Sequence, residues 1–313
     1  MSYASEREEV LKKKIIPQTI PADFEEFWQR ALAQLRAVPI QVKREKLVTP
    51  YDKFMNVWEL QYNTHDDTWV SAFFTQPKGL EGKLPCVVHF HGGSEKKNIF
   101  HAINTTGVCC LSIDVRSQGG CTIDKADYKT GDVNGGLMTR GMLNKEEFYM
   151  RNIFLDAVRA VDVAASFEEV DAERIVTWGG SQGGALTIVA AALSGKVKKA
   201  FPVMTSFCNL RRRVELASGI YGSVNAYLKK YPHNTDKVMD TLPYFDILNM
   251  VSLLKVPVDF AMGLGDTICL PEFVYSAYTH TASTEKTIQI FPFVPHTFPE
   301  AFVRYAHGEF AKL

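Results

Sequence analysis

The spacing of hydrophobic and polar residues predicts two kinds of element in this chain. Residues 24–35 place aromatic and aliphatic side chains three or four positions apart, which predicts a helix beginning near Asp23. Asp23 and Glu26 also have the spacing of a capping box. Segments 42–62 and 68–76 are rich in Val, Phe, Tyr and Trp, so they predict antiparallel strands at one edge of a sheet.

From Pro85 onward, short continuous apolar runs alternate with stretches of helical period. Such runs are typical of parallel strands that are buried on both faces of a sheet. The predicted strands are Cys86–Phe90, Val108–Val115, Arg174–Trp178, Lys199–Met204, Val256–Leu264 and Thr287–Phe293. The predicted helices are Phe148–Phe167, Gln182–Ser194 and Pro299–Lys312. The pattern predicts an α/β fold with a mostly parallel central sheet, flanking helices and an antiparallel N-terminal edge.

We expect a single domain over residues 1–313, because the chain contains neither an internal repeat nor a Gly/Ser-rich linker. Two stretches interrupt the alternation of strands and helices. Residues 117–147 are glycine-rich and polar, and residues 207–250 form an insertion longer than one connecting helix needs. Long insertions of this kind tend to be functional, as lids, pocket walls or oligomer contacts.

Charge and composition exclude several classes of partner. The chain has 35 Lys and Arg residues and 35 Asp and Glu residues, so no nucleic acid or anionic membrane partner is expected, nor a strongly charged substrate. Its apolar runs are shorter than a membrane span of about 18 residues, and residues 1–10 lack the apolar stretch of a secretory signal. The six cysteines lack C-x-x-C spacing, which predicts reduced core residues of a cytoplasmic protein.

The segment Trp178–Gly184 contains the motif G-x-S-x-G, centred on Ser181. In hydrolases this motif forms a strained strand-to-helix turn that exposes the serine hydroxyl above a sheet. A strand is predicted before the motif and an Ala-rich helix after it, which is the context that the motif requires. We therefore predict that Ser181 is a nucleophile and that the N–H of Gln182 is an oxyanion donor. A nucleotide-binding turn is disfavoured because G-x-G-x-x-G spacing and a Walker lysine are both lacking.

A serine nucleophile needs a base within hydrogen-bond reach, and the base needs a carboxylate that fixes its tautomer. In the α/β-hydrolase fold these residues follow in the order Ser, Asp, His. Asp266 closes a predicted strand after Ser181, whereas Asp259 lies within that strand and Asp246 lies in the insertion. His296 follows the last predicted strand, and the other late histidines lie in or at the end of helices. The predicted triad is Ser181, Asp266 and His296.

Three further features bear on the chemistry expected of this chain. Gly93 follows an early strand, where a backbone N–H commonly completes the oxyanion hole. His89 and His91 could place two metal ligands on one side of that strand, but no second ligand motif supports a metal site, and a structural role for His91 is favoured. We interpret Arg211–Arg213 as a source of surface or interface salt bridges in preference to an anion site. Neither a cofactor nor a metal is expected.

At these residues the chain resembles the acetyl xylan esterase / cephalosporin C deacetylase family, carbohydrate esterase family 7. The resemblance extends from the helix at Asp23 to the C-terminal helix. The most specific motifs are Arg116-Ser-Gln-Gly-Gly120, Gly179-Gly-Ser-Gln-Gly183, Asp266-Thr-Ile-Cys-Leu-Pro271 and Pro295-His296. Less specific stretches are Met138–Leu143, Phe154–Val161 and Phe207–Val214.

The resemblance implies a serine esterase that removes acetyl groups from small carbohydrates, typically xylo-oligosaccharides, and from cephalosporin C. It implies the triad Ser181, Asp266 and His296, with the N–H groups of Gly93 and Gln182 as oxyanion donors. It also implies a hexamer in which part of the insertion after Thr205 contributes contacts. The rival hypotheses are a peptidase or longer-acyl esterase on the same triad, and a non-catalytic binding protein of this fold.

The chain departs from the family pattern at four positions. Gly93 stands where the family usually has tyrosine, Ser117 where it has glycine, Leu270 where it has proline, and Thr297 where it often has glutamate. None of these departures removes a predicted triad residue. They bear instead on the acyl and alcohol specificity of the site.

Overall fold

The computed structural model describes residues 3–313, and its centre is one nine-stranded sheet. The strands are β1 (Val42–Leu47), β2 (Met55–Asn63), β3 (Trp69–Pro77), β4 (Leu84–Phe90), β5 (Cys109–Ile113), β6 (Val170–Gly180), β7 (Val197–Val203), β8 (Val258–Gly263) and β9 (Lys286–Phe291). Their spatial order is β1-β2-β3-β5-β4-β6-β7-β8-β9. The pairs β1–β2, β2–β3 and β3–β5 are antiparallel. The pairs β5–β4, β4–β6, β6–β7, β7–β8 and β8–β9 are parallel. The predicted mixed, mostly parallel sheet is confirmed.

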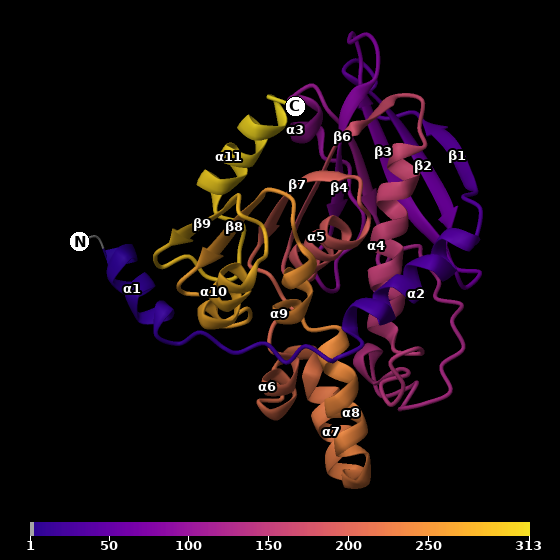
Figure 1. Ribbon diagram of the computed structural model, residues 1–313. Coiled ribbons are helices and arrows are strands. Elements are labelled where there is room, and N and C mark those ends of the chain that lie inside the picture. The colour runs from indigo at the N-terminus through magenta and orange to yellow at the C-terminus, as the bar shows by residue number, and fades with distance from the viewer. Residues whose placement is uncertain (1–2) are drawn as a thin grey trace.

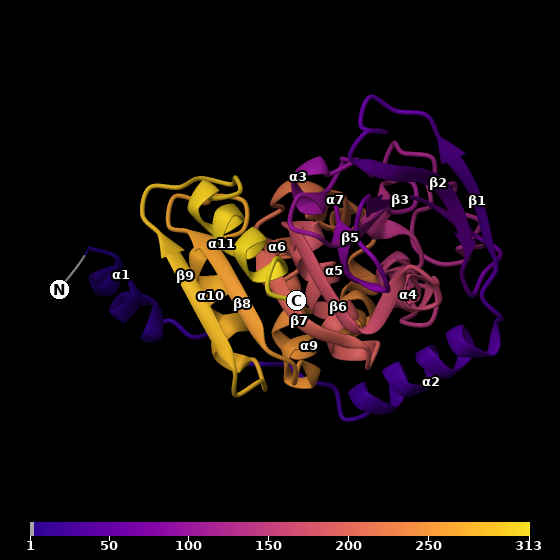
Figure 2. The same ribbon diagram turned by 90° about the horizontal axis from the view of Figure 1, so that it is seen from above.

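Helices cover both faces of this sheet (Figures 1 and 2). The α-helices are α1 (Tyr3–Lys12), α2 (Phe24–Ala37), α3 (His101–Asn104), α4 (Tyr149–Ala165), α5 (Gln182–Leu193), α6 (Leu210–Glu215), α7 (Gly222–Lys230), α8 (Thr235–Thr241), α9 (Ile247–Met250), α10 (Pro271–His280) and α11 (Glu300–Phe310). Short 3-10 helices lie at Leu137–Thr139, Gly219–Tyr221, Pro232–Asn234, Leu242–Tyr244 and Val251–Leu253. No helix within residues 3–313 is long and apolar enough to cross a membrane.

Alternate residues of the central strands enter two separate hydrophobic cores. Ile175 of β6 packs into the larger core with α2, α4 and α5, whereas Val176 and Trp178 pack into the smaller core with α3 and α11. Because strand side chains point alternately to the two faces, the continuous apolar runs of the sequence fill both cores. This explains why those runs predicted the central strands correctly.

Some local predictions from the pattern need correction. Segment 42–62 is two strands, β1 and β2, joined by a turn. Asp23 does precede α2, but its side chain makes no capping hydrogen bond. Its carboxylate instead accepts hydrogen bonds from Lys145 Nζ at 2.6 Å and from the hydroxyl of Tyr244. The prediction of a capping box is therefore wrong, because the Asp23 carboxylate bonds to Lys145 and Tyr244 instead of to the first turn of α2.

The insertion at residues 207–250 folds into α6, α7, α8 and α9 between β7 and β8. In Figure 1, α7 and α8 project away from the sheet, at the bottom of the view. The residue just before the insertion lies next to Ser181, because the N–H of Ser206 donates to the carbonyl of Ser181 at 3.0 Å. All six cysteines are free thiols, and Cys121 is the one that is exposed.

Candidate active site

Ser181 sits on a strained turn between β6 and α5. Its backbone has φ 57° and ψ −119°, a left-handed conformation that is rare for a residue with a side chain. The turn is held by hydrogen bonds from Ser181 N to Val203 O at 2.9 Å and from Ala185 N to Ser181 O at 3.1 Å. The predicted strand–turn–helix context of the serine is confirmed.

The two outer glycines of the motif are required by close backbone contacts. A Cβ atom on Gly183 would lie 1.9 Å from the carbonyl oxygen of Phe90, at the end of β4. A Cβ atom on Gly179 would lie 2.4 Å from the same oxygen. The missing side chains therefore let α5 begin directly against the end of the sheet, which sets the position of Ser181.

Asp266 and His296 come together because the loops after β8 and β9 are tied to each other. Gly265 N donates to Val294 O at 3.0 Å, and a Cβ atom on Gly263 would lie 2.2 Å from that same oxygen. This contact places His296 Nδ1 2.8 Å from Asp266 Oδ2. The hydrogen bond raises the pKa of His296 above that of a free histidine, because the carboxylate stabilises the imidazolium.

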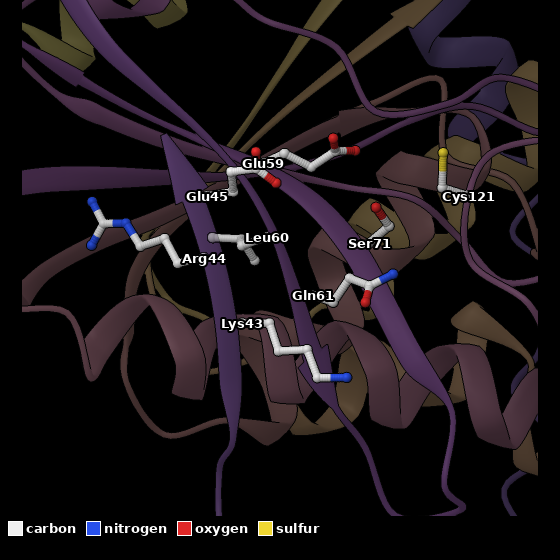
Figure 3. A pocket seen from close by; sticks show the side chains of 8 residues that line it. All are labelled: Lys43, Arg44, Glu45, Glu59, Leu60, Gln61, Ser71 and Cys121. Carbon is white, nitrogen blue, oxygen red and sulfur yellow. The ribbon is translucent and has the colours of Figure 1, made fainter. Parts of the chain in front are cut away.

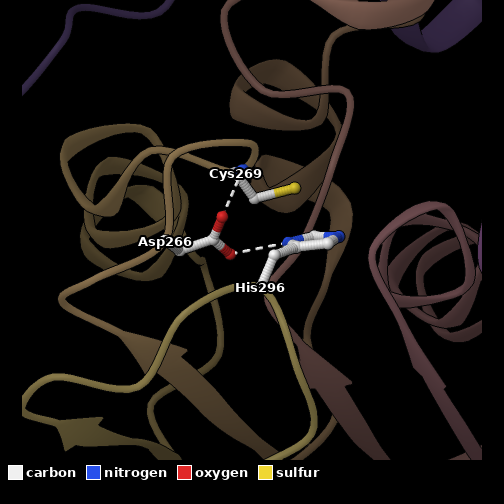
Figure 4. Close-up of side chains that lie close together, drawn as sticks. All are labelled: Asp266, Cys269 and His296. Carbon is white, nitrogen blue, oxygen red and sulfur yellow. Dashed lines mark hydrogen bonds and ion pairs between the residues drawn. The ribbon is translucent and has the colours of Figure 1, made fainter.

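Asp266 is fixed on its other side as well. Its Oδ1 accepts hydrogen bonds from Ile268 N and Cys269 N, both at 2.8 Å. The thiol of Cys269 completes a compact group, since one ligand atom from each of Asp266, Cys269 and His296 lies within 4.8 Å of the others (Figure 4). These are atom types that bind zinc, but Nδ1 of His296 is directed at Asp266, as in an acid–base pair.

Ser181 and His296 line the same cavity, which has a volume of about 360 Å³. Gly93 and Gln182 also line it, so the structure brings four of the five predicted site residues to one hollow. Asp266 lies behind His296 and is only 3% exposed. Gln182 is the first residue of α5, where backbone N–H groups have no partner within the helix. The residues predicted as oxyanion donors and as nucleophile therefore line one small cavity.

Gln118 is a residue of this site to which the sequence analysis assigned no role. Its side-chain amide exchanges two hydrogen bonds with that of Gln182, at 2.7 and 3.0 Å. Its Oε1 also accepts from Ser94 N at 3.2 Å. Gln118 thus bridges the loop of Gly93 and the start of α5, which carry the two predicted oxyanion donors. The only signal in the sequence was its place in the motif at residues 116–120.

A buried ionic cluster lies around Arg116, two residues before Gln118 in the same loop. Arg116 is 0% exposed and bonds Asp156 through Nε and Nη2, each at 2.7 Å. Its Nη1 donates to Asp66 at 2.5 Å and to Asp124 at 3.0 Å. Burial raises the pKa of Asp156 to about 6. Ser117, next in the chain, has φ 59°, a conformation that favours the glycine expected at this position.

The histidines of the H-x-H motif have structural partners. His91 Nδ1 lies 2.6 Å from Gly92 O, and His91 Nε2 accepts from Val115 N at 2.9 Å. His89 Nδ1 lies 3.2 Å from Ser112 Oγ, and burial lowers the pKa of His89 to about 3. Both ring nitrogens of His91 are therefore already engaged, in accord with the structural role favoured for it.

The interpretation of Arg211–Arg213 is correct for two residues and wrong for the third. Arg211 pairs with Asp240 at 3.8 Å and Arg212 with Glu215 at 2.8 Å, both on the surface. Arg213 is 3% exposed and lines the cavity of Ser181. Arg213, the fourth residue of α6, points inward, which the run of three identical residues could not reveal.

A larger hollow, of about 610 Å³, lies on the outer face of β1 and β2 (Figure 3). Its lining includes Lys43, Glu45, Glu59 and Gln61 and none of the predicted site residues. Ser71 also lines this hollow, but its hydroxyl oxygen accepts a hydrogen bond from Lys97 Nζ, and none of the lining residues is a histidine. Size alone therefore does not locate the site, whereas the chemistry of the residues does.

The fold and this arrangement of residues define an α/β hydrolase: a mostly parallel sheet, a serine on a strained turn after β6, an acid after β8 and a histidine after β9. Within that class the chain belongs to the acetyl xylan esterase (AXE1) family, whose model matches residues 8–312. The family resemblance seen in the sequence is thereby confirmed.

Known relatives agree with this assignment. Acetyl esterase Axe7A of Xylanibacter ruminicola is 25% identical over 277 residues, which cover 86% of this chain but 62% of that protein's length. The solved acetyl xylan esterase from Paenibacillus sp. R4 is 33% identical with a TM-score of 0.90, covering 100% of this chain and 99% of that one. Acetyl xylan esterase 1 from Thermoanaerobacterium sp. JW/SL YS485 is 27% identical with a TM-score of 0.89, covering 97% and 98%.

Proposed function

We propose that this protein is a serine esterase that removes acetyl groups from small acetylated carbohydrates through an acyl-enzyme. The observation that carries the proposal is the 2.8 Å hydrogen bond between Asp266 and His296, in a group that shares a cavity with the strained Ser181. Membership of the acetyl xylan esterase family supports the acetyl group as the acyl part. The names of the two solved relatives support a xylan-derived alcohol part.

In the proposed mechanism, His296 removes the proton of Ser181 while the hydroxyl attacks the ester carbonyl. The N–H groups of Gly93 and Gln182 stabilise the oxyanion, and one such donor can contribute about 10²–10³ in rate. Asp266 holds the tautomer of His296 and stabilises the imidazolium that forms. His296 then protonates the leaving alcohol, and water releases acetate from Ser181 by the same steps.

The decisive assay compares hydrolysis of 4-nitrophenyl acetate with that of the octanoate ester. Fast turnover of the acetate that disappears in Ser181→Ala supports both the triad and a small acyl pocket. A Cβ atom on Gly93 would meet no atom within 4 Å, so the site has room where the family usually has tyrosine. That space could hold a longer acyl chain. A preference for the octanoate ester would refute the assignment of acetyl as the preferred acyl group, but would be consistent with the proposed triad.

The rival hypotheses give different results in the same assay. A peptidase would hydrolyse the anilide of an acylated amino acid faster than the acetate ester. A binding protein without catalysis would turn over neither substrate, and a fluorophosphonate probe would fail to label Ser181. Labelling that is lost in Ser181→Ala would contradict the binding-protein hypothesis.

A hexameric assembly and a cytoplasmic location also stay predictions. The assembly rests on the family resemblance and is tested by light scattering coupled to size-exclusion chromatography. A mass of one 35.1 kDa chain at micromolar concentration would refute the assembly. Fractionation of the producing cells tests the location.

A further inference from the structure

The turn that carries Ser181 and the loop that carries His296 are held by different parts of the fold. The turn, residues 179–183, is tied to the end of β7, because the N–H of Ser181 donates to the last residue of that strand. The loop, residues 292–298, is tied to the acid-bearing loop through its own backbone and through His296 Nδ1. In the part of the chain that the structure describes, no hydrogen bond joins the turn to the loop. The placement of the base against the nucleophile is therefore left to side-chain packing.

Phe298 makes this packing contact. It follows His296 by two residues, and its ring lies against Gly180, the residue before Ser181. A Cβ atom on Gly180 would lie 2.5 Å from both Cε2 and Cζ of that ring. The ring also meets Trp178 edge-on, with the ring centroids 5.9 Å apart and the planes at 80°. One aromatic side chain of the His296 loop thus packs on the end of β6, directly before the nucleophile.

The ring explains why residue 180 is a glycine. The neighbouring motif glycines, Gly179 and Gly183, are obstructed by backbone atoms, whereas the three atoms nearest to a Cβ on Gly180 all belong to Phe298. Gly180 does not have a positive φ, so an alanine would fit its backbone conformation. The motif G-x-S-x-G also leaves this position open. Gly180 and Phe298 are therefore a matched pair, in which the missing side chain of one makes room for the ring of the other.

The chain on the far side of Phe298 is anchored as well. Phe298 leads directly into α11, where the N–H of Phe302 donates to the carbonyl of Pro299 at 2.9 Å. Phe302 is 0% exposed and belongs to the smaller core, together with Trp178. Phe298 itself is 39% exposed, so its removal would leave the core around α11 in place. The His296 loop is thus held at one end by the acid-bearing loop and at the other by Phe298.

We infer that Phe298 is a positioning residue for the esterase reaction, because its ring fixes the His296 loop against the turn that carries Ser181. This inference rests on the proposed function, since it assigns a further residue to that reaction. A misplacement of about 1 Å between reacting groups can cost about 10²-fold in rate, so one contact at this point is enough to matter. The loss should fall on kcat and not on KM, because the substrate can bind without the proton transfer to His296.

A double-mutant cycle tests the contact. Phe298→Ala should lower kcat for 4-nitrophenyl acetate by at least about tenfold and change KM by less than about twofold. Gly180→Ala should also lower kcat, because the new Cβ atom must push the ring away. In the Phe298→Ala background the same change at Gly180 should cost nothing further, since the ring that it would displace is absent. The two losses should therefore not multiply in the double variant.

Further measurements separate positioning from a general loss of structure. In Phe298→Ala the acidic limb of the pH profile of kcat/KM should stay at the wild-type pH, because the bond from His296 to Asp266 is retained. The rate at which a fluorophosphonate labels Ser181 should fall together with kcat, because that reaction also needs the base. Phe298→Leu, which keeps part of the apolar contact, should keep part of the rate. The matched control is Phe293→Ala, which removes an 80% exposed ring of the same loop and should leave kcat within about twofold of the wild type.

Three results would overturn the inference. A wild-type kcat in Gly180→Ala would do so by itself, so a failure of Phe298→Ala to fold does not leave the inference untested. Losses that multiply in the double variant would show that Gly180 acts on the Ser181 turn independently of Phe298. A displaced acidic limb in Phe298→Ala would show that the variant disrupts the pair of His296 and Asp266 instead of its placement. In each case ester hydrolysis by the wild type that depends on Ser181 leaves the proposed function intact, whereas its absence refutes that function.

Discussion

Replacing Gly183 by alanine tests how tightly the fold positions the predicted oxyanion donor. The new Cβ atom would lie 1.9 Å from the carbonyl oxygen of Phe90, and 2.7 Å from the carbonyl carbon of the same residue. Both atoms belong to the backbone of β4, so no side-chain rotation relieves the overlap. The start of α5 must therefore move away from the sheet by about 1 Å, and a misplacement of that size at a reacting centre can reduce the rate about 10²-fold.

Gly183→Ala should lower kcat/KM for 4-nitrophenyl acetate by about 10²-fold and the free energy of unfolding by about 1–3 kcal/mol, as overpacking does. The measurements are initial rates and urea denaturation of the purified variant. Gly308→Ala is the control, because a Cβ atom there meets nothing within 4 Å and alanine favours the helix by about 0.5–1 kcal/mol. If Gly183→Ala kept wild-type rates and stability, the proposed role of this contact would be wrong.

Three other variants test the remaining parts of the site. Asp266→Asn should reduce kcat by about 10⁴-fold. It should also move the acidic limb of the pH profile of kcat/KM to lower pH, because His296 acts as a base when neutral and the carboxylate that raises its pKa is lost. An acidic limb at the wild-type pH would contradict this. Gln118→Ala should lower kcat/KM about tenfold by releasing Gln182, with little change in melting temperature; steady-state kinetics and thermal denaturation decide between this role and a purely structural one. Arg116→Met should reduce the free energy of unfolding by about 3–5 kcal/mol at neutral pH, since it leaves buried carboxylates unpaired. Without Arg116 the pKa of buried Asp156 should rise above its wild-type value of about 6, so the contribution of Asp156 to the deficit should shrink as the pH falls towards 6. Urea denaturation at two pH values, one near 6 and one well above it, would contradict the account if the deficit stayed constant.

The central strands and the strained turn at Ser181 could be predicted from the sequence because both depend on local patterns. A continuous apolar run such as Cys86–Phe90 indicates a strand covered on both faces, and β4 occupies that run with its residues buried. The structural context that the motif around Ser181 requires is local too, since it consists of the strand before the motif and the helix after it. The order Ser, Asp, His then selected Asp266 and His296 from the other late acids and histidines.

Other features depend on residues that are far apart in the chain. The side chain of Asp23 bonds Lys145 and Tyr244 instead of its own helix, and no local spacing indicates partners 122 and 221 positions away. The role of Gln118 appears only when its loop meets α5, 64 residues later. Long-range hydrogen bonds of this kind are specified by the packed fold and not by sequence spacing.

The sequence by itself therefore determined the class of fold, the family and the three residues predicted for the triad, because apolar period and motif order are properties of the chain. Only the tertiary structure decided what surrounds Ser181. Arg211, Arg212 and Arg213 are identical in the sequence, yet packing places the first two on the surface and the third, 3% exposed, in the cavity wall. The direction in which a side chain of a short helix points depends on the core against which that helix packs, and this core is assembled from distant segments.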